Sequence, residues 1–270
     1  MNLSKIRLVV SDMDGTLLNS KHEVSPRFFE LFKQLQSLGI TFVAASGRQY
    51  YSIIDKLHAI KDDIIVIAEN GALTMQRDQE LQTTALDFDT YLEVLNLTSK
   101  IEGSQTILCG RDKGYFENHG DDFTNLVSEF YARYQVVDNL SDIDNEQYLK
   151  LAICNRQGSE KHIYPHVKHL EDRLKIKVSG EIWLDISHQK ADKGNALQQL
   201  QEQLNIPKEE TMAFGDFNND LEMLSRANFS FAMENAHPNI TKAAKYQTKS
   251  NNDYGVERIL EKLVEAKKAL

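Results

Sequence analysis

Short apolar runs alternate with amphipathic stretches at the beginning of the chain. Residues 6–10 form a run rich in β-branched side chains, which is typical of a buried parallel strand. Ser25 and Pro26 predict the start of a helix, because serine caps a helix and proline suits its first turn. Apolar runs at 40–45 and 64–68 predict two further strands, with a second helix between them. This alternation predicts an α/β fold with a doubly wound parallel sheet.

The rhythm of the pattern changes near residue 85 and returns after residue 190. In the middle segment strand-like runs come in groups, which is typical of an α+β arrangement. The pattern there predicts helices near 91–95, 122–133 and 159–174 and strands at 106–109, 115–117, 148–154, 175–178 and 182–186. The last part predicts helices at 196–204, from 221 and at 256–264, and strands at 211–214, 229–233 and 246–248. We therefore expect a sheet domain made of residues 1–84 and 188–270, with an α+β domain at 85–187 inserted into it.

Composition narrows the class of protein. The chain has 270 residues, of which 41% are hydrophobic and 26% charged, as in ordinary globular proteins. Its two cysteines, Cys109 and Cys154, exclude a disulfide framework and suit a reducing cytoplasm. The longest aliphatic run, at 64–68, is too short to cross a bilayer. The net charge of −9 repels phosphate backbones. We expect a cytoplasmic protein that binds neither nucleic acid nor membranes.

Polar side chains follow the predicted strands, at the edge where an open α/β sheet binds its ligands. Asp12 and Asp14 come after the first strand, and such carboxylates suit a hard cation like Mg²⁺. A carboxylate can also attack phosphorus, and a second one can transfer protons. Ser46 follows the next strand, where its hydroxyl and backbone N–H groups can bind a phosphate. Lys193 precedes a helix and can neutralise phosphate charge.

A fourth strand end carries Gly215-Asp216 and Asn219-Asp220. A bare Asp-x-Asp pair also occurs in glycosyltransferases and in solvated turns, so the case for a site rests on all four strand ends together. Taken alone, Ser46 could be a helix N-cap and Asp220 an acid favoured at a helix start.

These segments together resemble the haloacid dehalogenase (HAD) superfamily of phosphohydrolases, in its Cof-type branch, whose cap is of type IIB. The resemblance is carried by Asp12-Met13-Asp14-Gly15-Thr16-Leu17, Ser46-Gly47-Arg48, Glu69-Asn70-Gly71-Ala72, Lys193-Gly194 and Gly215-Asp216-Phe217-Asn218-Asn219-Asp220. It covers the whole chain. The segment between Thr16 and Pro26 is too short to contain a cap domain. The segment between Arg48 and Lys193 is long enough to contain one. The resemblance implies a Rossmann-like catalytic core (1–84 and 188–270) and an inserted α+β cap (85–187).

The resemblance also implies the activity. It indicates a phosphoric monoester hydrolase that uses Mg²⁺ and an aspartyl phosphate, with a sugar phosphate or a nucleotide or cofactor phosphate as substrate. Asp12 would be the nucleophile and a metal ligand. Asp14 would be the general acid and base, with its main-chain carbonyl on the metal. Asp216 would be a further metal ligand, and Asp220 would bind the metal directly or support its ligands.

Four residues would hold the transferring phosphoryl group by the same resemblance. They are Ser46, Gly47, Lys193 and Asn219. A phosphomutase or phosphotransferase could use the same aspartyl phosphate, and a non-catalytic metabolite-binding regulator is a third possibility. We expect a monomer or a small homo-oligomer.

Two further groups of residues have both a structural and a functional interpretation. Trp183 and Phe116 could stack on a substrate, although aromatic residues in strands more often belong to a core. His162, His166 and His169 have helical spacing on the predicted helix 159–174. A solvated surface explains them better than a metal site does, because no acidic or cysteine partner has suitable spacing.

Overall fold

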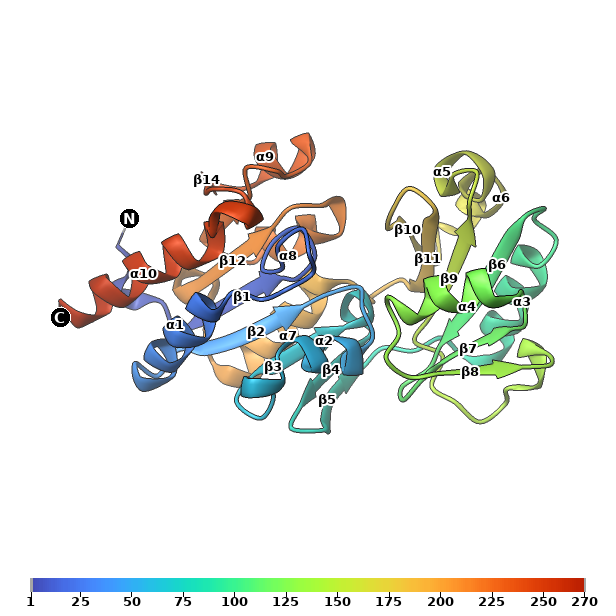
Figure 1. Ribbon diagram of the computed structural model, residues 1–270, viewed down its shortest axis with the longest axis horizontal. Helices are drawn as coiled ribbons and strands as arrows, with labels where there is room; N and C mark the ends of the chain where they lie inside the picture. The colour runs from blue at the N-terminus through green and yellow to red at the C-terminus, as the bar shows by residue number, and fades with distance from the viewer. Residues whose placement is uncertain (1, 270) are drawn as a thin grey trace.

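Two β-sheets form the frame of the molecule, and the computed structural model describes residues 2–269 (Figure 1). The first sheet has eight strands in the order β14-β13-β12-β1-β2-β3-β4-β5, and the second has six in the order β10-β11-β9-β6-β7-β8. They lie at opposite ends of an elongated molecule, with helices around each (Figure 1). The mixed α/β architecture with a parallel sheet confirms the predicted fold class.

The first sheet is parallel from β14 to β3, and β4 and β5 extend it antiparallel. Its strands are β1 (Leu8–Asp12), β2 (Thr41–Ala45), β3 (Ile65–Ala68), β4 (Leu73–Gln76), β5 (Gln79–Thr83), β12 (Thr211–Gly215), β13 (Phe229–Ala232) and β14 (Tyr246–Gln247). The helices of this part are α1 (Pro26–Ser37), α2 (Tyr50–Lys56), α7 (Lys193–Leu204), α8 (Leu221–Ser225), α9 (Pro238–Ala243) and α10 (Gly255–Lys268).

Apolar packing on both faces explains why β1 is buried along its whole length. On one face Val9 joins a cluster with Phe28 of α1 and Leu260 of α10. On the other face Val10 packs with Leu197 and Leu200 of α7. A central strand covered on both sides holds its carboxyl end rigidly, which is what a site at that end requires.

The second sheet is covered by helices on two sides. Its strands are β6 (Ser104–Cys109), β7 (Gly114–Glu117), β8 (Tyr134–Val137), β9 (Lys150–Asn155), β10 (Leu174–Val178) and β11 (Trp183–His188). Its helices are α3 (Phe88–Thr98), α4 (Asp121–Ser128), α5 (Ser159–His162) and α6 (Tyr164–Val167). Tyr91 of α3 stacks on Tyr148 at 4.6 Å between ring centroids. Phe123 of α4 packs in a separate cluster with Phe116 of β7.

The predicted helix over 159–174 is wrong. The segment forms α5, α6 and a short 3-10 turn at Lys168–Leu170. Pro165 explains the break, because it has no N–H to donate within a continuing helix. The hairpin of β4 and β5 was not predicted either. Arg77 and Asp78 form its turn with φ of 50° and 61°. Glycine or asparagine is the usual sequence signal for such a turn, and neither residue type occurs at these two positions.

All strands of the first sheet lie within 1–84 or 188–270, and the second sheet spans residues 104–188. That 85–187 is a separate domain stays a prediction. Within residues 2–269, no helix combines the length and the apolar character that a membrane crossing needs.

One serine joins the start of α1 to α10. Ser25 accepts a hydrogen bond at its Oγ from the N–H of Phe28 at 3.1 Å and donates one to buried Glu257 at 2.5 Å. We expect Ser25→Ala to lower the free energy of unfolding by about 2 kcal/mol, since it removes a helix cap and a donor to a buried carboxylate. Urea unfolding measures the change. Ser37→Ala, at the exposed end of the same helix, is the matched control, and equal stability of the two variants would contradict this account.

Candidate active site

The central strands of the first sheet bring two carboxylates to one edge. Asp12 is the last residue of β1, and Asp216 follows β12, its parallel neighbour. Ligand oxygens of Asp12, Asp216 and Asp220 lie within 4.8 Å of one another, the one such group among residues 2–269. Carboxylates this close repel one another unless a cation lies between them.

Lys193 supplies such a cation from the first turn of α7. Its Nζ donates to Asp12 Oδ1 at 2.6 Å and to Asp220 Oδ1 at 2.7 Å, and its side chain is fully buried. Burial alone would lower the pKa of Lys193, but the carboxylates of Asp12 and Asp220 outweigh it and raise that pKa. The helix begins at Lys193 because the side chain of Asp192 caps it by accepting from the N–H of Asn195.

The carboxylate cluster still lacks positive charge. Burial, together with the nearby Asp220 carboxylate, raises the pKa of Asp12 well above its usual range and that of Asp216 to about 7. Asp12 Oδ2 is buried and has no hydrogen-bond partner among residues 2–269. Asp220 Oδ2 accepts from the N–H groups of Asp216 and Phe217. The free carboxylate oxygens therefore belong to Asp12 and Asp216, which fits a divalent cation.

Gly15 makes room for Asp216. A Cβ at this position would lie 2.2 Å from Asp216 Oδ2, and the φ of Gly15 is +75°. Both the space and the backbone conformation require glycine here.

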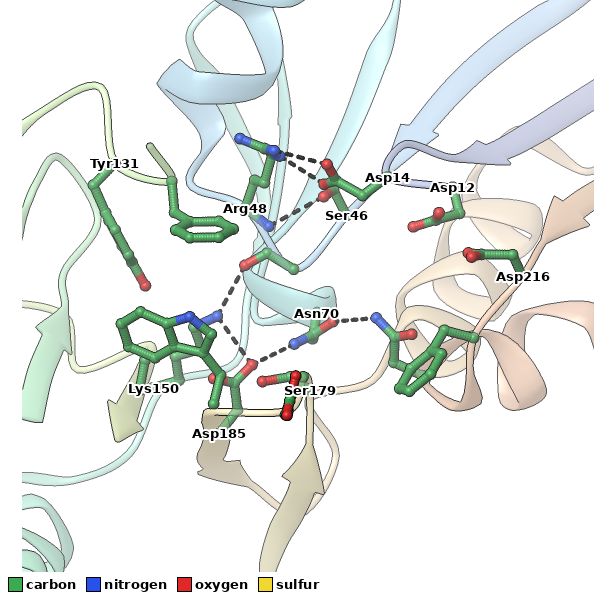
Figure 2. A pocket seen from close by; sticks show the side chains of 18 of the residues that line it. Asp12, Asp14, Ser46, Arg48, Asn70, Tyr131, Lys150, Ser179, Asp185 and Asp216 are labelled. Atoms are coloured by element: carbon green, nitrogen blue, oxygen red, sulfur yellow. Dashed lines mark hydrogen bonds and ion pairs between the residues drawn. The ribbon is translucent and has the colours of Figure 1, made fainter. Parts of the chain in front are cut away.

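Asp14 lies beside Asp12, but its carboxylate is turned toward Arg48 and takes no part in the cluster of Asp12, Asp216 and Asp220 (Figure 2). Arg48 donates to both of its oxygens, at 2.6 and 2.7 Å, and His22 lies 3.3 Å away. Burial would raise the pKa of Asp14, but the Arg48 guanidinium outweighs it and lowers that pKa. Arg48 also donates to the backbone oxygen of Glu129 at 2.9 Å and lies over the ring of Phe130. The arginine thereby connects the Asp14 carboxylate to the α4–β8 segment.

The other predicted phosphate-binding residues lie at the ends of β2 and β12. Ser46 is buried, and its Oγ accepts from the N–H of Arg48 at 3.1 Å, which leaves the hydroxyl proton free to donate. Gly47 lies against Asn70, where a Cβ would come within 3.0 Å of the amide. Asn219 donates its amide to Asn70 Oδ1 at 3.0 Å.

A cavity of about 430 Å³ lies between the two sheets. Six of the predicted site residues line it: Asp12, Asp14, Ser46, Gly47, Asp216 and Asn219. Lys193 and Asp220 do not line it, because both are fully buried behind Asp12.

Of the two aromatic candidates, Trp183 lines the cavity and Phe116 is buried in the core of the second sheet. His162, His166 and His169 are distributed over three short helical segments and take no part in the metal-ligand group above.

Sequence reasoning missed a buried charged group between the sheets. Lys150 Nζ of β9 lies 3.0 Å from Glu69 Oε2 and 3.2 Å from Asp185 Oδ2 of β11, and it donates to the backbone oxygen of Gly47 at 2.8 Å. Burial raises the pKa of Glu69. The sequence did contain a signal for this group, because the apolar strands 150–155 and 183–188 each contain one charged residue, Lys150 and Asp185.

We expect Lys193→Met to destabilise the fold by about 3–5 kcal/mol at neutral pH, because it leaves two buried carboxylates without their cation. Chemical denaturation measures the loss. Adding Asp220→Asn should recover part of it, since one of the stranded charges is then gone. A Lys193→Met protein as stable as the unsubstituted one would show that the ion pairs do not hold this site together.

Comparisons with known proteins agree with this geometry. Residues 9–260 match the profile of the haloacid dehalogenase-like hydrolases. YbjI of Escherichia coli, a 5-amino-6-(5-phospho-D-ribitylamino)uracil phosphatase, is 34% identical over 266 residues, which cover 96% of each chain.

Two solved structures have the same fold as this chain. SMU.1108c of Streptococcus mutans has a TM-score of 0.88 and 31% identity, covering 96% of this chain and 99% of its own. The subclass IIB sugar phosphatase BT4131 shares the fold, with a TM-score of 0.81, 21% identity and coverage of 95% and 98%. The chain belongs to the haloacid dehalogenase-like hydrolases and is an enzyme of their phosphatase branch.

Proposed function

We propose that the chain hydrolyses a small phosphorylated metabolite through an aspartyl phosphate on Asp12, with Mg²⁺ as cofactor. One observation carries the proposal. Lys193 fixes Asp12 Oδ1, while Asp12 lines the cavity and its Oδ2 is buried and has no hydrogen-bond partner in the described part of the chain. An oriented carboxylate with one free oxygen has what a nucleophile needs, provided that a cation offsets its repulsion from phosphate.

The residues fit Mg²⁺. Asp12 and Asp216 would provide carboxylate oxygens and Asp14 its main-chain carbonyl, while Asp220 would support them through Lys193 and the N–H of Asp216. A bound Mg²⁺ would screen the negative charges of carboxylate and phosphate from each other. Burial and the neighbouring Asp220 carboxylate raise the pKa of Asp216, and a cation beside it would favour the ionised form that binds metal.

The reaction then has two halves. In the first, an oxygen of Asp12 bonds to phosphorus as the bond from phosphorus to the leaving oxygen breaks, and Asp14 gives that oxygen a proton. In the second, water attacks phosphorus and gives a proton to Asp14, which frees phosphate and restores Asp12. Arg48 lowers the pKa of Asp14 and so favours its ionised form, which is the form that enters the second half, whereas the first half starts from the protonated form.

The phosphoryl group needs donors at its outer oxygens. The hydroxyl of Ser46, the backbone at Gly47 and the amide of Asn219 line the cavity and would supply them. Lys193 would act through Asp12, since its ammonium is held between Asp12 and Asp220.

We further propose that residues 1–84 and 188–270 form the catalytic core and 85–187 a cap that closes over the cavity and selects the substrate. The relative that dephosphorylates a ribityl-aminouracil phosphate supports a sugar phosphate or a nucleotide-like cofactor precursor as the substrate class. The same relationship favours water over a sugar hydroxyl as the phosphoryl acceptor. The two free, buried cysteines suit a cytoplasmic enzyme.

Asp12→Asn should lower phosphate release from p-nitrophenyl phosphate by about a thousandfold or more, because the amide is a poor nucleophile. A colorimetric assay with Mg²⁺ measures the rate. Asp62→Asn makes the same chemical change at an exposed position and is the control. If the Asp12 variant keeps the rate of the control, Asp12 is not the nucleophile.

EDTA should abolish turnover, and added Mg²⁺ should restore it. Mg²⁺ should also raise the melting temperature of the protein, since a ligand that binds only the folded state stabilises it. In Asp216→Asn we expect the thermal shift to disappear. A shift of the same size in that variant would place the ion elsewhere.

A further inference from the structure

The second sheet supplies the wall of the cavity that lies opposite the carboxylate cluster. Tyr131, Trp183 and Asp185 belong to this wall, and Figure 2 shows Tyr131 and Asp185 across the cavity from Asp12 and Asp216. If the phosphoryl group binds at Asp12, as in the proposed function, the leaving group must lie against this wall.

The wall carries a surplus of negative charge. Among the described residues, Lys150 is the only cation that the second sheet contributes to the cavity, and it is already paired with Asp185 and with Glu69, which lies outside the cavity lining. Arg48 of the first sheet also lines the cavity, but it is paired with Asp14. Glu181 lines the same wall and is exposed. A second phosphate or carboxylate on the substrate would meet this surplus of acid.

Asp185 offers a free acceptor at this wall. The residue is only 6% exposed. Its Oδ2 accepts from Asn70 at 2.8 Å and from Lys150 at 3.2 Å. Its Oδ1 has no donor among residues 2–269. Because Asn70 also accepts from Asn219, one chain of hydrogen bonds connects Asp185 to the phosphate end of the cavity.

An apolar surface completes the wall. Trp183 and Phe130 line the cavity and pack edge to face, with ring centroids 5.9 Å apart. An aromatic surface next to a fixed carboxylate suits a ligand that has an apolar face and hydroxyl or N–H donors at its edge.

We propose that Asp185 determines specificity and that the enzyme takes monophosphates whose leaving group is uncharged and rich in O–H or N–H donors. Monosaccharide, polyol and amino-heterocycle phosphates have this chemistry. Bisphosphates with the second phosphate at the far end of the leaving group do not, because that phosphate would lie against Asp185 and Glu181. This proposal rests on the proposed function, since it assumes that the phosphoryl group binds at Asp12.

Competition against p-nitrophenyl phosphate tests the proposal. Fructose 6-phosphate and fructose 1,6-bisphosphate form one pair of probes, and glucose 6-phosphate and glucose 1,6-bisphosphate a second. We expect the inhibition constant of each bisphosphate to be at least about tenfold higher than that of its monophosphate, and this ratio is the quantity to compare between variants. In Asp185→Asn the ratio should fall toward one, because the monophosphate loses an acceptor and the bisphosphate loses a repulsive charge.

Asp172→Asn removes one charge from an exposed position in the same part of the chain and should leave the ratio unchanged. Glu181→Gln should lower the ratio as Asp185→Asn does, but by a smaller amount. If the Asp185 variant does not fold, the Glu181 variant tests the proposal in its place. Equal inhibition within the pairs, no inhibition by any of the four probes, or a ratio that neither variant moves would overturn the proposal. Failure of the unsubstituted enzyme to release p-nitrophenol would instead contradict the proposed function.

Discussion

The site depends on one buried cation among acids. Lys193 lies between Asp12 and Asp220, which come from strand and helix ends far apart in the chain. Without this ammonium the carboxylates would repel one another, and burial would favour their protonated forms. With it, Asp12 has one oxygen fixed and one free. The packing of β1 between two apolar layers and the capped start of α7 both serve to hold this arrangement in place.

A second buried group connects the two sheets. Lys150 contacts Glu69, Asp185 and the backbone of Gly47, so an element of the second sheet lies directly against the loop after β2 that carries Ser46 and Gly47. Arg48 makes a similar connection from Asp14 to Glu129. Because charged pairs of this kind tolerate little displacement, the position of the second sheet and the geometry of the site depend on each other.

Local sequence signals were enough for most strands, for the start of α1 and for the carboxylates at the strand ends, but not for β4, β5 and β8. Ser25-Pro26 marks α1, and Asp12 ends β1 as its apolar run predicts. The pairing of Lys150 with Asp185 and of Arg48 with Glu129 was not predictable, because these residues lie 35 and 81 positions apart and no periodic pattern relates them. The sequence also did not indicate that Lys193 is buried behind Asp12, since a lysine at a helix start is ordinarily exposed.

Chemical trapping of the intermediate tests the central claim most directly. The enzyme is quenched in acid during turnover with Mg²⁺, reduced with borohydride and mapped by peptide mass spectrometry. An acyl phosphate on Asp12 becomes homoserine under this treatment, so the account predicts homoserine at position 12, only when substrate is present. Homoserine at another aspartate, or none at any position during rapid turnover, would contradict it.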